Sequence, residues 1–184
     1  MRPEEVLHSL REGNERFATG GMVRHERVTD PTGAIPAHKP KAVIIACSDA
    51  RVPPEHVFDQ GPGEIFVVRV AGHVLESAGW ASVWFAVEGV GARTVVVLGH
   101  EGCAAVETSV STNPPAALDP VVGPIRERTG CCADVTEAIE ANVRAAVAEA
   151  RERLSDAAER LGEEIVVVGA ICSVRTGFVE WLSD

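Results

Sequence analysis

Short apolar runs alternate with amphipathic segments along the 184 residues of this chain. Continuous runs rich in β-branched residues are typical of strands that are buried on both faces of a parallel sheet. The predicted strands are 42–46, 65–70, 94–98 and 165–171, and the predicted helices are 3–17, 53–58, 76–89 and about 134–154. Strands and helices that alternate in this way imply crossover connections and a parallel sheet. We therefore predict a single α/β domain over residues 1–184, with a mostly parallel sheet of about four strands flanked by helices.

The pattern is less regular at the two ends of the chain. Thr176 and Gly177 have the turn chemistry that would lead into the apolar run 178–182, which predicts an antiparallel edge strand. Residues 20–40 contain three prolines and no periodicity. A structureless loop of this length is uncommon inside a compact domain, so we expect residues 1–40 to form an amino-terminal helix and an arm that lies on a neighbouring subunit. The prolines at 114–124 predict a second irregular connection.

Charge and cysteine content narrow the class of protein. The formal net charge of -10 argues against nucleic acid or an anionic membrane as a partner, because both require a basic surface. The chain has no run of 18 apolar residues and no visible signal peptide. Its five cysteines show no spacing typical of a disulfide framework. We therefore expect a cytoplasmic protein.

Metal-ligating side chains follow two of the predicted strands. Cys47 comes directly after the run 42–46, and His100 and Cys103 follow the run 94–98. Open α/β sheets bind ligands beyond the carboxyl ends of their strands, so these side chains converge if the two strands are neighbours. Two thiolates and an imidazole are zinc ligands, and three protein ligands leave the fourth position for water or substrate. The sequence thus predicts one catalytic Zn2+ per chain.

Asp49 and Arg51 complete the candidate site, since they lie two and four residues after the first cysteine. Arg51 can hold Asp49 in a bidentate ion pair, which would lower the pKa of the carboxyl group and fix its direction. An ionised Asp49 would then accept a hydrogen bond from zinc-bound hydroxide. If Arg51 releases it, the Asp49 carboxylate is instead a candidate fourth zinc ligand in a closed state of the site.

The pattern Cys47-x-Asp49-x-Arg51 followed by His100-x-x-Cys103 resembles that of the β-class carbonic anhydrases, in particular their bacterial branch. Three further segments, 10–17, 58–72 and 168–179, are similar to segments of that family. The resemblance implies a zinc lyase that reversibly hydrates carbon dioxide to bicarbonate and a proton. It also implies a homodimer or a dimer of dimers.

The same resemblance implies which side chains meet the substrate. These positions are His38, Phe66, Ala71, His73, Phe85 and Ala104. Relatives usually carry Gln, Asn, Tyr and Gly where this chain has His38, His73, Phe85 and Ala104. We expect Phe66 and Phe85 to form an apolar approach for CO2 at a subunit interface. Two alternatives stay open: a catalytically silent zinc-binding relative that acts as a bicarbonate sensor or structural subunit, and a zinc hydrolase of carbonyl sulfide or carbon disulfide.

Overall fold

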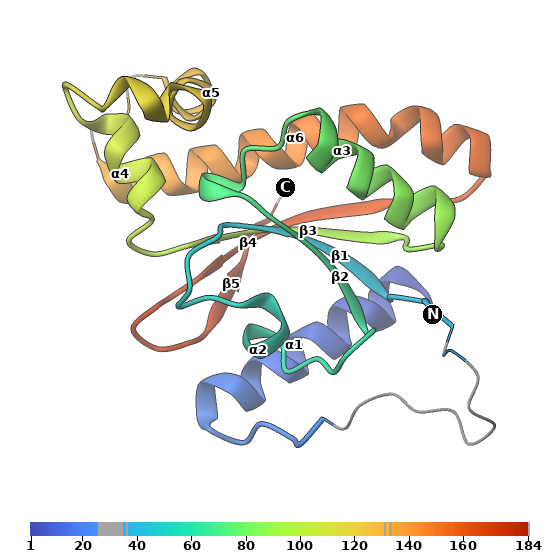
Figure 1. Cartoon of the computed structure of the whole chain (residues 1–184). Coiled ribbons are helices and arrows are strands. Elements are labelled where there is room, and N and C mark those ends of the chain that lie inside the picture. The colour runs from blue at the N-terminus through green and yellow to red at the C-terminus, as the bar shows by residue number, and fades with distance from the viewer. Residues whose placement is uncertain (26–34, 36, 131, 133, 184) are drawn as a thin grey trace.

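A five-stranded sheet in the order β2-β1-β3-β4-β5 forms the centre of the computed structural model (Figure 1). The structure describes residues 1–25, 35, 37–130, 132 and 134–183. The strands are β1 Ala42–Ala46, β2 Ile65–Arg69, β3 Thr94–His100, β4 Val166–Cys172 and β5 Val179–Trp181. The first four are parallel and β5 pairs antiparallel with β4. The predicted sheet is therefore confirmed, and every residue of β1 and β3 is buried, as continuous apolar runs indicate.

Helices cover both faces of the sheet (Figure 1). The helices are α1 Pro3–Thr19, α2 Pro54–Val57, α3 Ser77–Trp84, α4 Ala104–Val110, α5 Asp119–Thr129 and α6 Val135–Leu161. Helices α3 and α6 pack on one face around a core of valines and alanines, and α1 and α2 pack on the other. Short 3-10 turns span Ala71–His73 and Ala116–Leu118, and a π-helical turn, Phe85–Gly89, continues α3. Among the described residues, no helix combines the length and apolar character that a membrane crossing requires.

Helix α1 approaches the rest of the molecule closely at Gly13 and Asn14. A Cβ atom on Gly13 would lie 1.8 Å from the carbonyl oxygen of Phe58, so only glycine permits this approach. The Asn14 Nδ2 group donates to the carbonyl oxygens of Val57 at 3.0 Å and Gly177 at 2.8 Å. Its Oδ1 atom accepts from the backbone N–H of Val179 at 2.8 Å. One buried side chain thus ties α1 to α2 and to the turn between β4 and β5.

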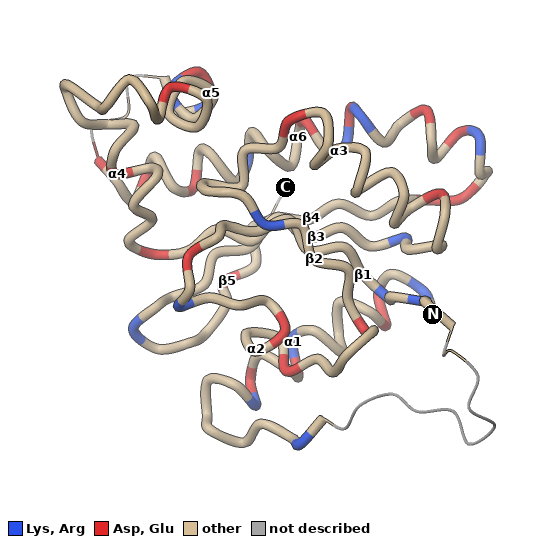
Figure 2. Tube along the Cα trace, viewed as in Figure 1, with Lys and Arg blue, Asp and Glu red and all other residues tan. Residues whose placement is uncertain are grey.

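Helix α6 is longer than the apolar pattern predicts, because it continues past residue 154 to Leu161. Asp134 caps its beginning by accepting a hydrogen bond from the N–H of Glu137 at 3.0 Å, and Gly162 ends it in a left-handed conformation. Both acidic and basic residues are distributed along the helix (Figure 2). Ion pairs such as Arg153–Glu149 at 2.8 Å support the helix up to residue 153, and beyond it Leu154 and Ala157 are buried against the core.

The expected irregular connection at 114–124 is partly wrong, because residues 119–129 form helix α5. Pro120 lies in the first turn, where a missing N–H costs nothing. Gly123 precedes Pro124 and has no Cβ to collide with the proline ring. Val122 and Ile125 anchor the helix in the core. Of the expected arm at 20–40, residues 26–34 and 36 lie outside the described residues.

Candidate metal centre

Three side chains meet at the carboxyl end of the sheet, as the sequence predicts. Strands β1 and β3 are neighbours, and Ala46 is paired with Leu98. Cys47 follows β1, His100 is the last residue of β3, and Cys103 immediately precedes α4. Their ligand atoms all lie within 4.8 Å of one another, and all three residues are buried. The only difference from the prediction is that β3 extends to include His100.

The geometry of this cluster fits a tetrahedral metal ion. The two sulfur atoms are 4.0 Å apart, close to the roughly 3.8 Å separation that Zn–S bonds of about 2.3 Å give in a tetrahedron. The His100 Nδ1 atom pairs with the carbonyl oxygen of Glu101 at 3.0 Å. Its buried Nε2 atom has no hydrogen-bond partner among the described residues. The imidazole is therefore oriented by one nitrogen and free to bind a metal through the other.

Cys103 donates a hydrogen bond to Cys47, and their sulfur atoms are 4.0 Å apart. The hydrogen bond from Cys103 lowers the pKa of Cys47 to about 3, with help from the Gly72 N–H at 3.3 Å. The same contact, together with burial, raises the pKa of Cys103 well above its ordinary value. Metal binding must displace the proton of the Cys103 thiol, so metal affinity at this cluster depends on pH.

Asp49 is held beside the cluster by Arg51. The Arg51 Nε and Nη2 atoms donate to the two carboxylate oxygens at 3.0 and 2.7 Å, and the Arg51 backbone N–H donates at 2.9 Å. These contacts hold the pKa of Asp49 at about 2. The Asp49 Oδ2 atom lies 4.0 Å from His100 Nε2. In this arrangement the carboxylate is an ionised acceptor next to the cluster, with its direction fixed by the guanidinium.

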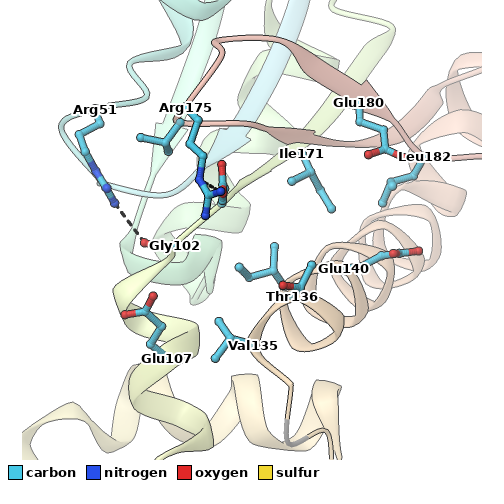
Figure 3. A pocket seen from close by; sticks show the side chains of 13 residues that line it. Arg51, Gly102, Glu107, Val135, Thr136, Glu140, Ile171, Arg175, Glu180 and Leu182 are labelled. Carbon is cyan, nitrogen blue, oxygen red and sulfur yellow. Dashed lines mark hydrogen bonds and ion pairs between the residues drawn. The ribbon is translucent and has the colours of Figure 1, made fainter.

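Arg51 also links the two ligand segments and borders a pocket. Its Nη2 atom donates to the carbonyl oxygen of Gly102 at 3.0 Å (Figure 3). The pocket has a volume of about 480 Å3, and apolar side chains, Arg175 and glutamates that include Glu107 and Glu140 line it (Figure 3). The three clustered side chains do not line it. Arg51 thus stands between the metal cluster and this pocket.

Arg69 contributes to the site in a way that sequence reasoning missed. From the end of β2, its Nε atom donates to the carbonyl oxygen of Cys47 at 2.9 Å, and its Nη2 atom donates to that of Asp49 at 2.5 Å. These bonds fix the loop that carries both functional side chains. The available signal was an arginine at the end of the otherwise apolar run 65–69, since a half-buried charge needs a polar partner.

Three of the expected substrate positions form an aromatic row. The ring of His38 is stacked on Phe66 with centroids 5.9 Å apart, and Phe66 lies 6.4 Å from Phe85. Phe85 is 55% exposed, although it is a large apolar residue. The structure therefore brings these side chains from β2, from the segment before β1 and from the turn after α3 to one surface.

The other three expected substrate positions have different surroundings. Ala104 is exposed at the start of α4, and Ala71 is half-buried in the 3-10 turn. His73 is almost fully buried, and its Nε2 atom pairs with Asn142 Nδ2 at 3.0 Å. Burial, together with the positive charge of Arg128, lowers the pKa of His73 to about 4. The ring is therefore neutral at physiological pH and is held by α6.

Comparison with known proteins gives one consistent result. A family model described as carbonic anhydrase matches residues 42–179. The chain is 43% identical over 110 residues to carbonic anhydrase 2 of Mycobacterium tuberculosis, an alignment that covers 59% of this chain and 53% of that protein. It is 38% identical over 110 residues, with the same coverage, to a carbonic anhydrase of Mycolicibacterium smegmatis. The chain thus spans about half the length of the curated relatives it matches.

Solved structures agree with the sequence comparison. The β-carbonic anhydrase CafA of Aspergillus fumigatus superposes with a TM-score of 0.65 at 28% identity, covering 83% of this chain and 79% of that one. A β-carbonic anhydrase of Coccomyxa, solved in complex with acetazolamide, gives a TM-score of 0.69 at 20% identity, covering 97% and 82%. Because the family model spans most of the sheet and both ligand segments, the chain belongs to the β-class carbonic anhydrase family.

Proposed function

We propose that this protein is a zinc-dependent carbonic anhydrase that interconverts CO2 and bicarbonate. The observation that carries the proposal is the buried cluster of Cys47, His100 and Cys103, whose ligand atoms lie within 4.8 Å of one another in a member of this family. Three protein ligands of this kind leave one position of a tetrahedral zinc ion open. We assign one zinc ion per chain to this cluster.

In the proposed reaction, Asp49, Arg51 and Arg69 have different roles. A zinc ion bound by such ligands acidifies a water molecule and so supplies a nucleophile near neutral pH. With a pKa of about 2, Asp49 accepts a hydrogen bond but does not keep a proton, so its role is to orient the attacking oxygen. Arg51 keeps Asp49 ionised and aimed, and Arg69 holds their loop. The overall reaction converts CO2 and water into bicarbonate and a proton, which leaves to solvent.

Substrate access, assembly and location are parts of the same proposal. We assign the approach of CO2 to the apolar surface of Phe66 and Phe85 with His38, which a second subunit would cover in a homodimer or a dimer of dimers. The exposure of Phe85 supports this assignment. We also place His73, Ala71 and Ala104 near bound substrate, although burial of His73 makes an indirect role the natural one for that residue. A cytoplasmic location would keep both cysteine ligands reduced.

Metal analysis and stopped-flow CO2 hydration test the proposal together. Wild-type protein should bind one zinc per chain and hydrate CO2, and Cys47→Ser should lose both. Cys172→Ser is the matched control, because Cys172 is buried but lies outside the cluster. Full zinc content in Cys47→Ser would refute the ligand assignment. Zinc binding without CO2 hydration would favour the silent relative, and faster turnover of carbonyl sulfide would favour the hydrolase.

A further inference from the structure

Asn142 is a fully buried amide that belongs to α6 yet contacts the loop behind the metal cluster. Its exposed fraction is 0%. The Nδ2 atom lies 3.2 Å from the carbonyl oxygen of Gly72 and 3.0 Å from His73 Nε2, and Oδ1 lies 3.3 Å from Arg128 Nη1. The NH2 group of this side chain is thus directed at the Gly72–His73 turn, and its oxygen at one arginine.

The partners fix which way the amide faces. A guanidinium can only donate, so the oxygen of Asn142 must face Arg128. The NH2 group then donates both to the Gly72 carbonyl and to His73 Nε2. It follows that His73 Nε2 is an acceptor and that the neutral ring carries its proton on Nδ1. Among the described residues, Nδ1 has no hydrogen-bond partner, so Asn142 is the polar group that holds the ring.

The turn that Asn142 holds has an unfavourable backbone. Gly72 has φ 59° and His73 has φ 48°, so two successive residues are left-handed. A non-glycine residue in this region is strained, and the surrounding structure must hold it there. A Cβ on Gly72 would lie 2.6 Å from Ile125 Cδ1, so any other residue would also require the buried Ile125 side chain to shift. In this conformation the Gly72 N–H points at Cys47 Sγ, 3.3 Å away.

We propose that Asn142 is a positioning residue of the metal centre, which holds the Gly72–His73 turn so that the Gly72 N–H donates to the Cys47 sulfur. The inference rests on the proposed function, because it takes Cys47 as a metal ligand. A hydrogen bond to a ligating thiolate withdraws charge from the sulfur and fixes its direction. The side chain of a distant helix therefore tunes how strongly Cys47 binds the metal and how much positive charge the metal retains.

Asn142→Asp is the sharpest test. Aspartate has the same shape and keeps an oxygen for Arg128, but it cannot donate to Gly72 and His73. Cobalt(II) would replace zinc, because its thiolate-to-metal charge-transfer band reports on the sulfur directly. We expect the band to move to lower energy and cobalt affinity, measured by chelator competition, to fall by about 10-fold or more.

Val147→Ala is the matched control, since Val147 lies in the core on the same helix beside Gly169 rather than beside the turn. It should lower stability without moving the band. The proposal is overturned if Asn142→Asp leaves band and affinity unchanged, or if Val147→Ala shifts the band equally. If Asn142→Asp does not fold, Asn142→Leu removes the same donors, and we expect the same shift of the band and the same loss of cobalt affinity. Absence of the band in the wild-type protein would refute the metal site itself, which separates the two failures.

Discussion

Replacing Gly13 by alanine tests how α1 is attached to the sheet. Alanine normally stabilises the interior of a helix by about 1 kcal/mol relative to glycine. At position 13 we expect the opposite sign, because the new Cβ would lie 1.8 Å from the Phe58 carbonyl oxygen, against about 3.4 Å for ordinary contact. The obstacle is backbone rather than a flexible side chain, so the helix itself must move away.

The cost follows from what that movement breaks. A displacement of more than an ångström stretches the three hydrogen bonds of Asn14, which are now 2.8–3.0 Å long. Each is worth about 1 kcal/mol, and the propensity gain offsets about one of them. With imperfect repacking added, we expect a net loss of about 2–4 kcal/mol of unfolding free energy. For a domain of this size that lowers Tm by roughly 5–15 °C.

Urea denaturation followed by circular dichroism measures the effect. Glu15 lies on the exposed side of the same helix, so Glu15→Ala and Glu15→Gly give the intrinsic alanine–glycine difference in this setting. We expect alanine to be favoured at position 15 and glycine at position 13. Equal or greater stability of Gly13→Ala, with an unchanged m-value, would refute the reasoning about the close approach.

Three further outcomes are expected. Burial disfavours ionisation of Asp59, but hydrogen bonds from Arg16, from His25 and from a backbone N–H outweigh it and lower its pKa. The stabilisation by ionised Asp59 should therefore be present above the unfolded carboxyl pKa of about 4 and be lost as the pH falls below it. In urea titrations, the unfolding free energy of Asp59→Asn should fall less steeply at acid pH than that of the wild-type protein. Parallel pH profiles for the two proteins would contradict this expectation. Arg51→Ala should lower CO2 hydration by about 10- to 100-fold and free Asp49. X-ray absorption of the zinc-loaded variant should then show a carboxylate oxygen in place of water at the fourth zinc position, and a spectrum identical to that of the wild-type protein would argue against the closed state. Chelation of the metal should lower Tm by roughly 5–10 °C if zinc is about 100-fold above its Kd, and an unchanged melting curve would show that the metal is not linked to folding.

The sheet was predictable because its strands are buried on both faces and therefore read as continuous apolar runs. Helix α5 was not, since Pro124 inside the segment is a strong local signal against helix, and Pro120 suits a helix only if the helix begins there. Its existence depends on burial of Val122 and Ile125 against other elements, and on the glycine before the second proline. Local helix propensity cannot predict this helix, because the contacts that bury Val122 and Ile125 come from segments far away in sequence.

Some residues of the candidate site could be predicted from the sequence, and others could not. The metal-binding chemistry of Cys47, His100 and Cys103 is evident from their residue types. The pairing of β1 with β3 then brings the three side chains together. Arg69 and Asn142 are common polar residues whose roles arise from bonds to residues 20–70 positions away. Whether the ligands and substrate positions act as proposed stays a prediction for the experiments above. The assignment of residues 1–184 to one domain also stays a prediction.

The placement of the ligands on two different strands affects how the chain folds. Cys47 follows β1 and His100 ends β3, so a three-ligand site does not exist until these two parallel strands pair across the intervening helices and β2. Parallel pairing of distant segments requires closing a long loop, which is slow and comes after local structure. The rate of metal uptake during refolding would therefore report the rate at which β1 and β3 pair. A metal ion with an absorption band, such as cobalt(II), would allow that step to be followed.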